Sequence, residues 1–141
     1  MGAREKSVQQ VRVIHVAFVV TWFLFIFILQ YEVKPAERPI EPITVAALAL
    51  AAVSSVSVGW TMRGKHLAMA AEVLQREPED AAAIARWRFA NILSCAFAES
   101  VTLFGFMLKM MGARWTIAGW FFAGGMILLL LWWPRLEASN L

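Results

Sequence analysis

The sequence predicts an all-α integral membrane protein, a single membrane domain over residues 1–141 built as a four-transmembrane-helix bundle. Sixty per cent of the residues are hydrophobic and only 16% are charged, whereas a soluble domain carries about 25% charged residues. Four apolar segments are each long enough to cross a bilayer as a helix. The seven tryptophans suit anchoring at membrane interfaces. The net charge of +3 is small and scattered, so we expect a lipid bilayer around the chain and no nucleic-acid partner.

The predicted spans cover about residues 11–31, 43–62, 89–111 and 115–133. Residues 32–42, EVKPAERPIEP, hold three prolines and must form a loop. Residues 63–88 form a polar connector that we expect to be helical, because its two halves are rich in Ala and Leu. Pro78 should end the first of these helices near Glu77. The second and third spans therefore continue past the bilayer to a cytoplasmic turn at Arg76, Glu77 and Pro78.

Lysine and arginine are distributed unequally across the predicted membrane. Four lie on or near one side: Lys34, Arg38, Lys109 and Arg114. Nine lie on the side of the Pro78 turn: Arg4, Lys6, Arg12, Arg63, Lys65, Arg76, Arg86, Arg88 and Arg135. Because cytoplasmic loops carry the excess of Lys and Arg, both termini and the 63–88 connector should be cytoplasmic. The expected location is a bacterial inner membrane.

Small side chains recur at every fourth position of the second span. Ala47, Ala51, Ser55 and Gly59 should share one helix face, where small residues allow the close helix contacts that lipid-embedded packing needs. One tight helix pair or a multimeric ring would use this device equally well, so both remain open.

One carboxylate, Glu99, interrupts the apolar third span. A helix rises about 1.5 Å per residue, so Glu99 lies roughly 15 Å from a segment end near Phe89, close to the bilayer midplane. An acid at that depth costs at least ~2.5 kcal/mol on insertion scales, and such residues serve ion or proton chemistry by default. The alternative is a protonated acid that only hydrogen-bonds a neighbouring helix. Desolvation favours the neutral acid in lipid, and a wet channel or a partner's cation would favour the anion.

Three neighbours are candidate partners of Glu99 in ion binding, namely Cys95, Ser100 and Thr102. Cys95, Glu99 and Thr102 share a helical stripe with Asn91 and Lys109, and Lys109 is expected to snorkel outward. No cofactor or metal is expected, because a single cysteine, two histidines and no second acid in the spans leave no metal set or catalytic triad. His15, one turn inside the first span, could be a proton relay, but a histidine at that depth is more often wetted by lipid headgroups, which is what we expect here.

The central hairpin resembles the c subunit, or proteolipid, of rotary ATP synthases. That family places a helix of small residues before a Gly-Lys pair and a polar Pro-containing turn, then a helix with a mid-membrane acid and an aromatic-Gly pair. Here the matching features are Gly64-Lys65, the turn Arg76-Glu77-Pro78-Glu79, Glu99 within LSCAFAESVTLFG, and Phe104-Gly105. The match covers about residues 46–111, roughly half of the chain. The first and fourth spans have no counterpart in a two-helix c subunit.

The resemblance implies a proteolipid whose Glu99 binds and translocates protons in an oligomeric complex, as a homo-oligomer or with other membrane subunits. It implies protons rather than sodium, because sodium forms use a Gln on the preceding helix and residues 43–62 contain none. A second interpretation stays open: a non-translocating four-span structural subunit or assembly factor. Bulky Val56, Val58 and Trp60, where the family has small residues, favour it. Catalysis by this chain alone is not expected, although it could be a subunit of a proton-translocating rotary ATPase.

Overall fold

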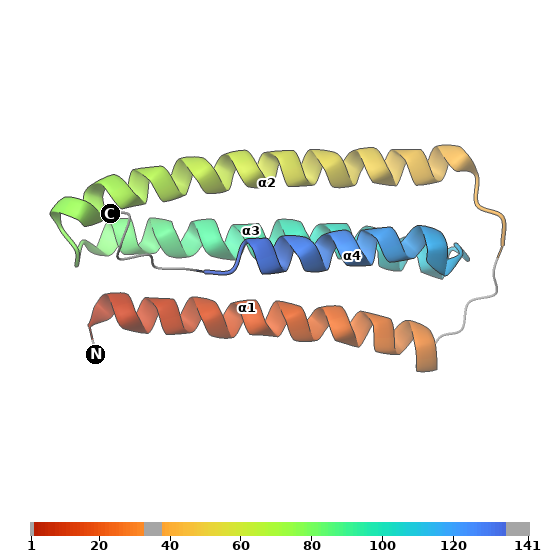
Figure 1. Ribbon diagram of the computed structural model, residues 1–141, viewed down its shortest axis with the longest axis horizontal. Coiled ribbons are helices and arrows are strands. Elements are labelled where there is room, and N and C mark those ends of the chain that lie inside the picture. Colours follow the sequence, from red (N-terminus) through yellow and green to blue (C-terminus); the bar gives the residue numbers. More distant parts are fainter. Residues whose placement is uncertain (1, 33–37, 135–141) are drawn as a thin grey trace.

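The fold is a bundle of long helices lying side by side (Figure 1). The computed structural model describes residues 2–32 and 38–134. Helix α1 covers Ala3–Phe27 and continues into a short π-helix, η1, at Ile28–Glu32. Helices α2, α3 and α4 cover Pro42–Arg76, Ala81–Met110 and Trp115–Leu131. The part of the chain that is described holds no strand, so the all-α prediction is confirmed.

Three of the helices are long and apolar enough to cross a membrane: Arg4–Tyr31, which joins α1 to η1, then α2 and α3. Their length and composition indicate an integral membrane protein. Helix α4 is apolar but has only 17 residues, about 25 Å at 1.5 Å per residue. Helix α1 begins eight residues before the predicted span, because the polar start of the chain extends the same helix. Part of the predicted loop, residues 33–37, lies outside the described residues.

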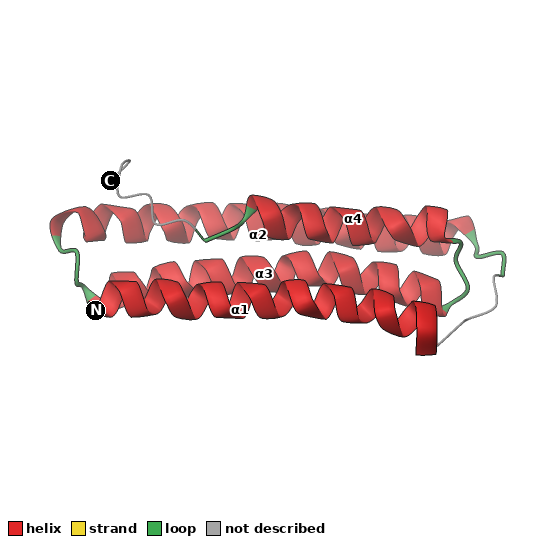
Figure 2. Ribbon diagram, turned by 60° about the horizontal axis from the view of Figure 1, so that its bottom comes forward, coloured by secondary structure: helices red, strands yellow, loops and turns green. Residues whose placement is uncertain are grey.

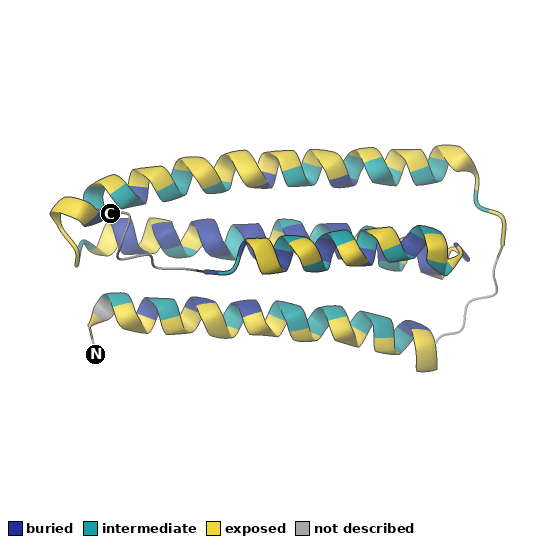
Figure 3. Cartoon of the chain, viewed as in Figure 1, coloured by how far each residue is buried: buried dark blue, intermediate teal, exposed yellow. Residues whose placement is uncertain are grey.

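Helix α3 is the centre of the bundle. It packs against α1, α2 and α4, and α1 also packs against α4. Figure 2, a view turned by 60°, shows that α1, α2, α3 and α4 all run along the same long axis. Burial follows this arrangement, because α3 carries many more buried residues than α2 does (Figure 3). The indole nitrogen of Trp22 in α1 also donates a hydrogen bond of 2.8 Å to the main-chain oxygen of Phe122 in α4.

The turn between α2 and α3 lies where Pro78 was predicted to break the helix. Helix α2 ends at Arg76, and the amide of Glu77 still donates to the Val73 oxygen at 2.8 Å. Asp80 is the N-cap of α3, and its carboxylate accepts a 2.6 Å hydrogen bond from the amide of Ala83. Such a cap satisfies an amide that has no partner within the helix. This turn and the start of α1 lie at one end of the bundle, on the left in Figure 1.

The opposite end of α3 closes on a glycine. Gly112 has a φ of 103°, a left-handed conformation that glycine adopts without a side-chain clash. The amide of Ala113 donates to the Leu108 oxygen at 2.9 Å, and that of Gly112 donates to the Lys109 oxygen at 3.0 Å. This pair of bonds is a Schellman motif. It turns the chain back, so that α4 runs antiparallel to α3.

Candidate functional site

Glu99 lies in α3 and is almost completely buried. Glu99 as a whole is 8% exposed, and both of its carboxylate oxygens are buried with no hydrogen-bond partner among the described residues. The other Asp and Glu side chains whose burial is described are exposed or half-buried: Glu5, Glu41, Glu72, Glu77, Glu79 and Asp80. Buried polar atoms in proteins are almost always hydrogen-bonded. An unpartnered pair of carboxyl oxygens is therefore the feature of this bundle that most needs a chemical explanation.

Helix α1 packs on the side of α3 that carries Glu99. Residues four before and seven after a given position share its helix face, which puts Cys95 and Phe106 on the face of Glu99. The Sγ atom of Cys95 lies 3.2 Å from Nδ1 of His15 in α1. The ring of Phe106 lies 5.1 Å from that of Phe25, also in α1. Glu99 thus belongs to the α1–α3 contact, whereas Gly59 of α2 packs against Phe97 on another side of α3.

His15 joins three helices one turn from Glu99. Its Nε2 lies 2.8 Å from the main-chain oxygen of Leu129 in α4. A carbonyl oxygen only accepts, so we assign the ring proton to Nε2 and leave Nδ1 to accept from the Cys95 thiol. The Leu129 oxygen is one of the last four carbonyls of α4, which lack partners inside a helix. His15 is 0% exposed, so the expectation that lipid headgroups wet it is wrong: the close approach of α1, α3 and α4 excludes them.

Buried polar groups continue from Glu99 toward the Pro78 end. Asn91 and Ser94 are buried and donate to main-chain oxygens of their own helix at 2.9 and 2.7 Å. From α2, Arg63 is half-buried, and the ring of His66 lies 5.3 Å from that of Phe89. Arg63 Nε and His66 Nδ1 are buried without a hydrogen-bond partner in the described part of the chain. Unpartnered polar atoms of this kind are where water enters protein interiors.

The other direction along α3 is closed by packing. Thr102 donates to the Ala98 oxygen at 3.5 Å, and its Oγ1 stands where a Cβ on Gly125 of α4 would be. Beyond Thr102, the bundle interior holds Gly105 and the fully buried Leu108. Buried polar side chains of α3 thus lie on both sides of Glu99: Asn91, Ser94 and Cys95 toward the Pro78 end, and Thr102 and Lys109 toward the Gly112 end.

Lys109 does not snorkel outward as the sequence suggested. It is buried, its Nζ donates to the Ala113 oxygen at 3.0 Å, and Nζ lies 5.3 Å from the centre of the Trp115 ring. The Gly112 turn explains the difference, because it brings a carbonyl oxygen and an aromatic face to the ammonium group. Together with Asn91, Cys95, Glu99 and Thr102, Lys109 completes a stripe of α3 whose five members are all buried.

The predicted companions of Glu99 do not bond to it. Cys95 pairs with His15, and Thr102 bonds within its own helix. Ser100 is half-buried and donates to the Ala96 oxygen at 2.9 Å. Among the described residues, Glu99 thus has neighbours of the predicted types but receives no hydrogen bond from them.

The small residues of α2 are only partly in contact. Gly59 is buried against the side chain of Phe97, whereas Ala51 and Ser55 are half-buried and Ala47 is exposed. Every fourth position drifts around a helix with 3.6 residues per turn, so the far end of the stripe leaves the contact. Ala52, seven residues before Gly59, is buried in its place.

The predicted turn residues lie on the surface. Arg76, Glu77 and Pro78 are all exposed, and Arg76 pairs with Glu72 at 3.9 Å. Such an exposed pair contributes little stability. Within the described residues, no group of three or more His, Cys, Asp or Glu side chains could hold a metal ion.

Comparison of the chain with protein-family models, with curated proteins and with solved structures finds no match. The likeness to c subunits therefore rests on the residues of the α2–α3 hairpin alone.

Proposed function

We propose that this chain is a four-span membrane protein in which Glu99 binds a proton near the bilayer midplane, as a c-subunit-like component of an oligomeric proton-translocating complex. The observation that carries the proposal is the burial of both Glu99 oxygens with no hydrogen-bond partner among the described residues. An anion in that position would be very costly, so the site suits the neutral acid. A change of surroundings that admits water or a cation would release the proton.

The proton would reach Glu99 from the Pro78 end. Asn91, Ser94 and Cys95 lie between Glu99 and that end. In the opposite direction Thr102 packs against Gly125, and Lys109 bonds to Ala113 at the Gly112 turn. Asn91 is two helical turns from Glu99, about 12 Å along the axis. Access from one side only would prevent a passive leak. Translocation then needs a movement, in this chain or between subunits, that opens the other side.

Charge and aromatic residues support the proposed topology. Eight described cations belong to the Pro78 half of the bundle and three to the other: Arg4, Lys6, Arg12, Arg63, Lys65, Arg76, Arg86 and Arg88 against Arg38, Lys109 and Arg114. The positive-inside rule then makes both termini cytoplasmic, in a bacterial inner membrane. Helix α4 would be the fourth span, because 17 residues is the short limit for crossing and Trp115 marks its N-terminal end.

Helix α1 gives the proposed mechanism a feature that a two-helix c subunit lacks. It packs on the Glu99 side of α3, so in this conformation the acid faces a helix of its own chain. If the proton is exchanged with a partner subunit, α1 must move away from Glu99. Alternatively, α1 itself forms the surface with which Glu99 exchanges the proton. We favour separation of α1 from α3 near Phe25 and Phe106, where rings 5.1 Å apart form a contact without a hydrogen bond.

A static structural subunit or assembly factor is the second candidate, and one observation favours it. His15 accepts a hydrogen bond from the Cys95 thiol and donates one to the Leu129 oxygen, which ties α1, α3 and α4 together. Such ties restrain the movement that translocation needs. In this alternative Glu99 is a permanently neutral acid inside a rigid bundle.

Proton flux into vesicles prepared from the native membrane, in which the chain keeps its partner subunits, separates the two candidates. With a membrane potential imposed and a pH-sensitive dye inside, wild type should acidify the lumen and Glu99→Gln should not. Ser100→Ala is the matched control. The Ser100 hydroxyl bonds to the Ala96 oxygen of its own helix, so its removal should leave the flux unchanged. Equal flux from wild type and Glu99→Gln, or no flux above vesicles that lack the chain, would leave the structural role as the function.

A further inference from the structure

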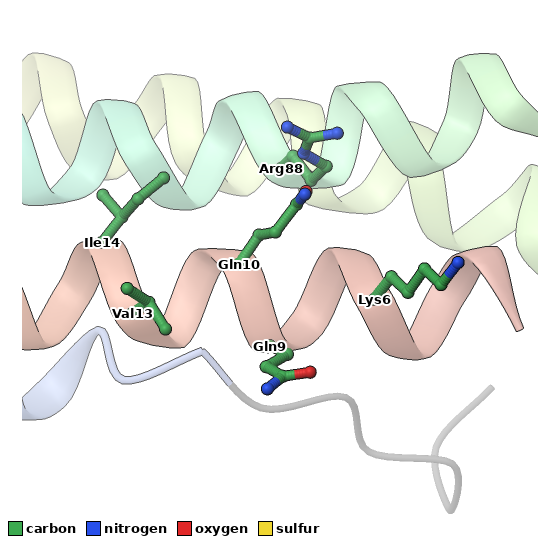
Figure 4. Close-up of a pocket in the computed structure, with 6 residues that line it drawn as sticks. All are labelled: Lys6, Gln9, Gln10, Val13, Ile14 and Arg88. Carbon is green, nitrogen blue, oxygen red and sulfur yellow. The ribbon is translucent and has the colours of Figure 1, made fainter. Parts of the chain in front are cut away.

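A hollow of about 560 Å³ opens between α1 and α3 near the Pro78 end of the bundle. It is lined by side chains from α1 and by a single residue of α3: Lys6, Gln9, Gln10, Val13, Ile14 and Arg88. Figure 4 shows Gln10 and Arg88 pointing toward one another across the space between the two helices. Two cations, two amides and two aliphatic side chains therefore line one open groove.

The two cations of this groove give it the charge that suits an anion. Lys6 is exposed and Arg88 is half-buried, and neither forms an ion pair with a residue that the structure describes. The amide side chains of Gln9 and Gln10 add hydrogen-bond donors. Arg is especially suited to phosphate, because its planar guanidinium can donate two parallel hydrogen bonds. The part of the groove nearest the Pro78 end, which holds Lys6 and Arg88, thus has the chemistry of a phosphate site.

From Val13 onward, away from the Pro78 end, α1 exposes a row of apolar side chains, which we call the apolar track. Lys6, Val13, Val20 and Phe27 are spaced by seven residues, so they share one face of the helix. Val13, Val20 and Phe27 are 64%, 59% and 49% exposed. From Val13 to Phe27 the track is about 21 Å long. A cation at one end of such a track complements an amphiphile with an anionic head and a hydrocarbon tail.

We propose that this groove binds an anionic phospholipid, with its phosphate on Lys6 and Arg88 and an acyl chain along Val13 and Val20. Basic pockets between transmembrane helices on the cytoplasmic side suit such headgroups, and Arg88 directly precedes the predicted third span. The inference rests on the proposed membrane insertion and topology but not on the chemistry of Glu99. It would hold equally for a proton carrier and for a structural subunit.

Native mass spectrometry of the full chain, purified in non-ionic detergent, tests the site. The chain is mixed with equal amounts of phosphatidylglycerol and phosphatidylcholine, and the lipids that remain bound are counted. Wild type should retain phosphatidylglycerol preferentially. A surface cation contributes ~1 kcal/mol to anionic-lipid binding, so the double variant Lys6→Gln with Arg88→Gln should lower that preference by on the order of 30-fold.

The control carries the same loss of charge outside the groove. Lys65→Gln with Arg86→Gln removes two exposed cations from the same end of the bundle and should retain phosphatidylglycerol like wild type. A Glu99→Gln chain should also behave like wild type, so a failure of the proton proposal stays distinguishable from a failure here.

Three results would overturn the lipid site. The first is equal retention of the two lipids by wild type, and the second is equal loss in the groove variant and its control. The third is displacement of phosphatidylglycerol by inorganic phosphate alone at similar concentrations, which would show a site for the free anion rather than for a lipid.

Discussion

The side chain of His15 in α1 caps the C-terminal end of α4 by donating a 2.8 Å hydrogen bond from Nε2 to the main-chain oxygen of Leu129. The same ring accepts from the thiol of Cys95 in α3. A fully buried imidazole with both nitrogens in use fixes the relative position of three helices. It does so within one helical turn of Glu99, the residue on which the proposed function depends.

Removing this imidazole should destabilise the bundle. His15→Ala leaves the Leu129 oxygen without its donor, and an unsatisfied buried group costs about 1–3 kcal/mol. Unfolding in mixed micelles, followed by circular dichroism as sodium dodecyl sulfate increases, measures the loss. His66→Ala is the control, because that half-buried ring makes an aromatic contact but no hydrogen bond from Nδ1. An equal loss in the two variants would mean that the His15 hydrogen bonds contribute nothing beyond packing.

Two glycines of α4 should respond in opposite ways to the same substitution. A Cβ on Gly125 would overlap the hydroxyl of Thr102, whereas a Cβ on Gly119 meets no atom within 4 Å. Overpacking typically costs ~1–3 kcal/mol, while Gly→Ala in an open helix position stabilises by up to about 1 kcal/mol. Gly125→Ala should therefore lower the unfolding free energy and Gly119→Ala should raise it. The close α3–α4 contact would be refuted if Gly125→Ala were neutral.

The same comparison tests the α2–α3 contact. A Cβ on Gly59 would come within 2.8 Å of the Phe97 side chain, and one on Gly64 meets nothing within 4 Å. Gly59→Ala should therefore weaken the bundle by ~1–3 kcal/mol, and Gly59→Leu should weaken it further. Gly64→Ala should not weaken it. If Gly59→Leu left both stability and oligomer size unchanged, this face of α2 would be exposed to lipid rather than packed.

Labelling of introduced cysteines tests the topology. Glu41 and Glu79 are exposed at opposite ends of α2 and α3, and the native Cys95 is buried and should not react. A membrane-impermeant maleimide added to intact cells should label Glu41→Cys and not Glu79→Cys, because the proposed topology places the Pro78 turn in the cytoplasm. The reverse pattern, or labelling at both positions, would contradict it.

The sequence predicted the helices well because hydropathy and Pro78 are local signals. The break between Arg76 and Ala81 depends on the restriction that proline imposes on the residue before it. The buried stripe of α3 was visible as polar residues at helical spacing within an apolar segment. A turn that needs a positive φ could likewise be expected at Gly112, the only glycine for which the structure records one.

The partners of the site could not be predicted, because they depend on which helices meet. The sequence pointed to a hairpin of the second and third spans, but α3 also packs against α1 and α4. One available signal was missed: Val11, His15, Phe18 and Trp22 follow a spacing of four and three residues, which is that of a helix-packing face. That spacing places His15 inside the bundle. The bond from Lys109 to Ala113 had no such signal, because it depends on the geometry of the Gly112 turn.

The most direct test of the central claim is the reaction of Glu99 with dicyclohexylcarbodiimide, which attacks protonated acids in apolar surroundings. Mass spectrometry of the labelled chain should find the adduct at Glu99 and not at the exposed Glu79. The yield should fall as pH rises, because deprotonation depletes the reactive neutral acid. Sodium should not protect the site, and Glu99→Gln should abolish the adduct. An unreactive Glu99, or labelling that sodium suppresses at constant pH, would contradict the account of Glu99 as a proton-binding acid.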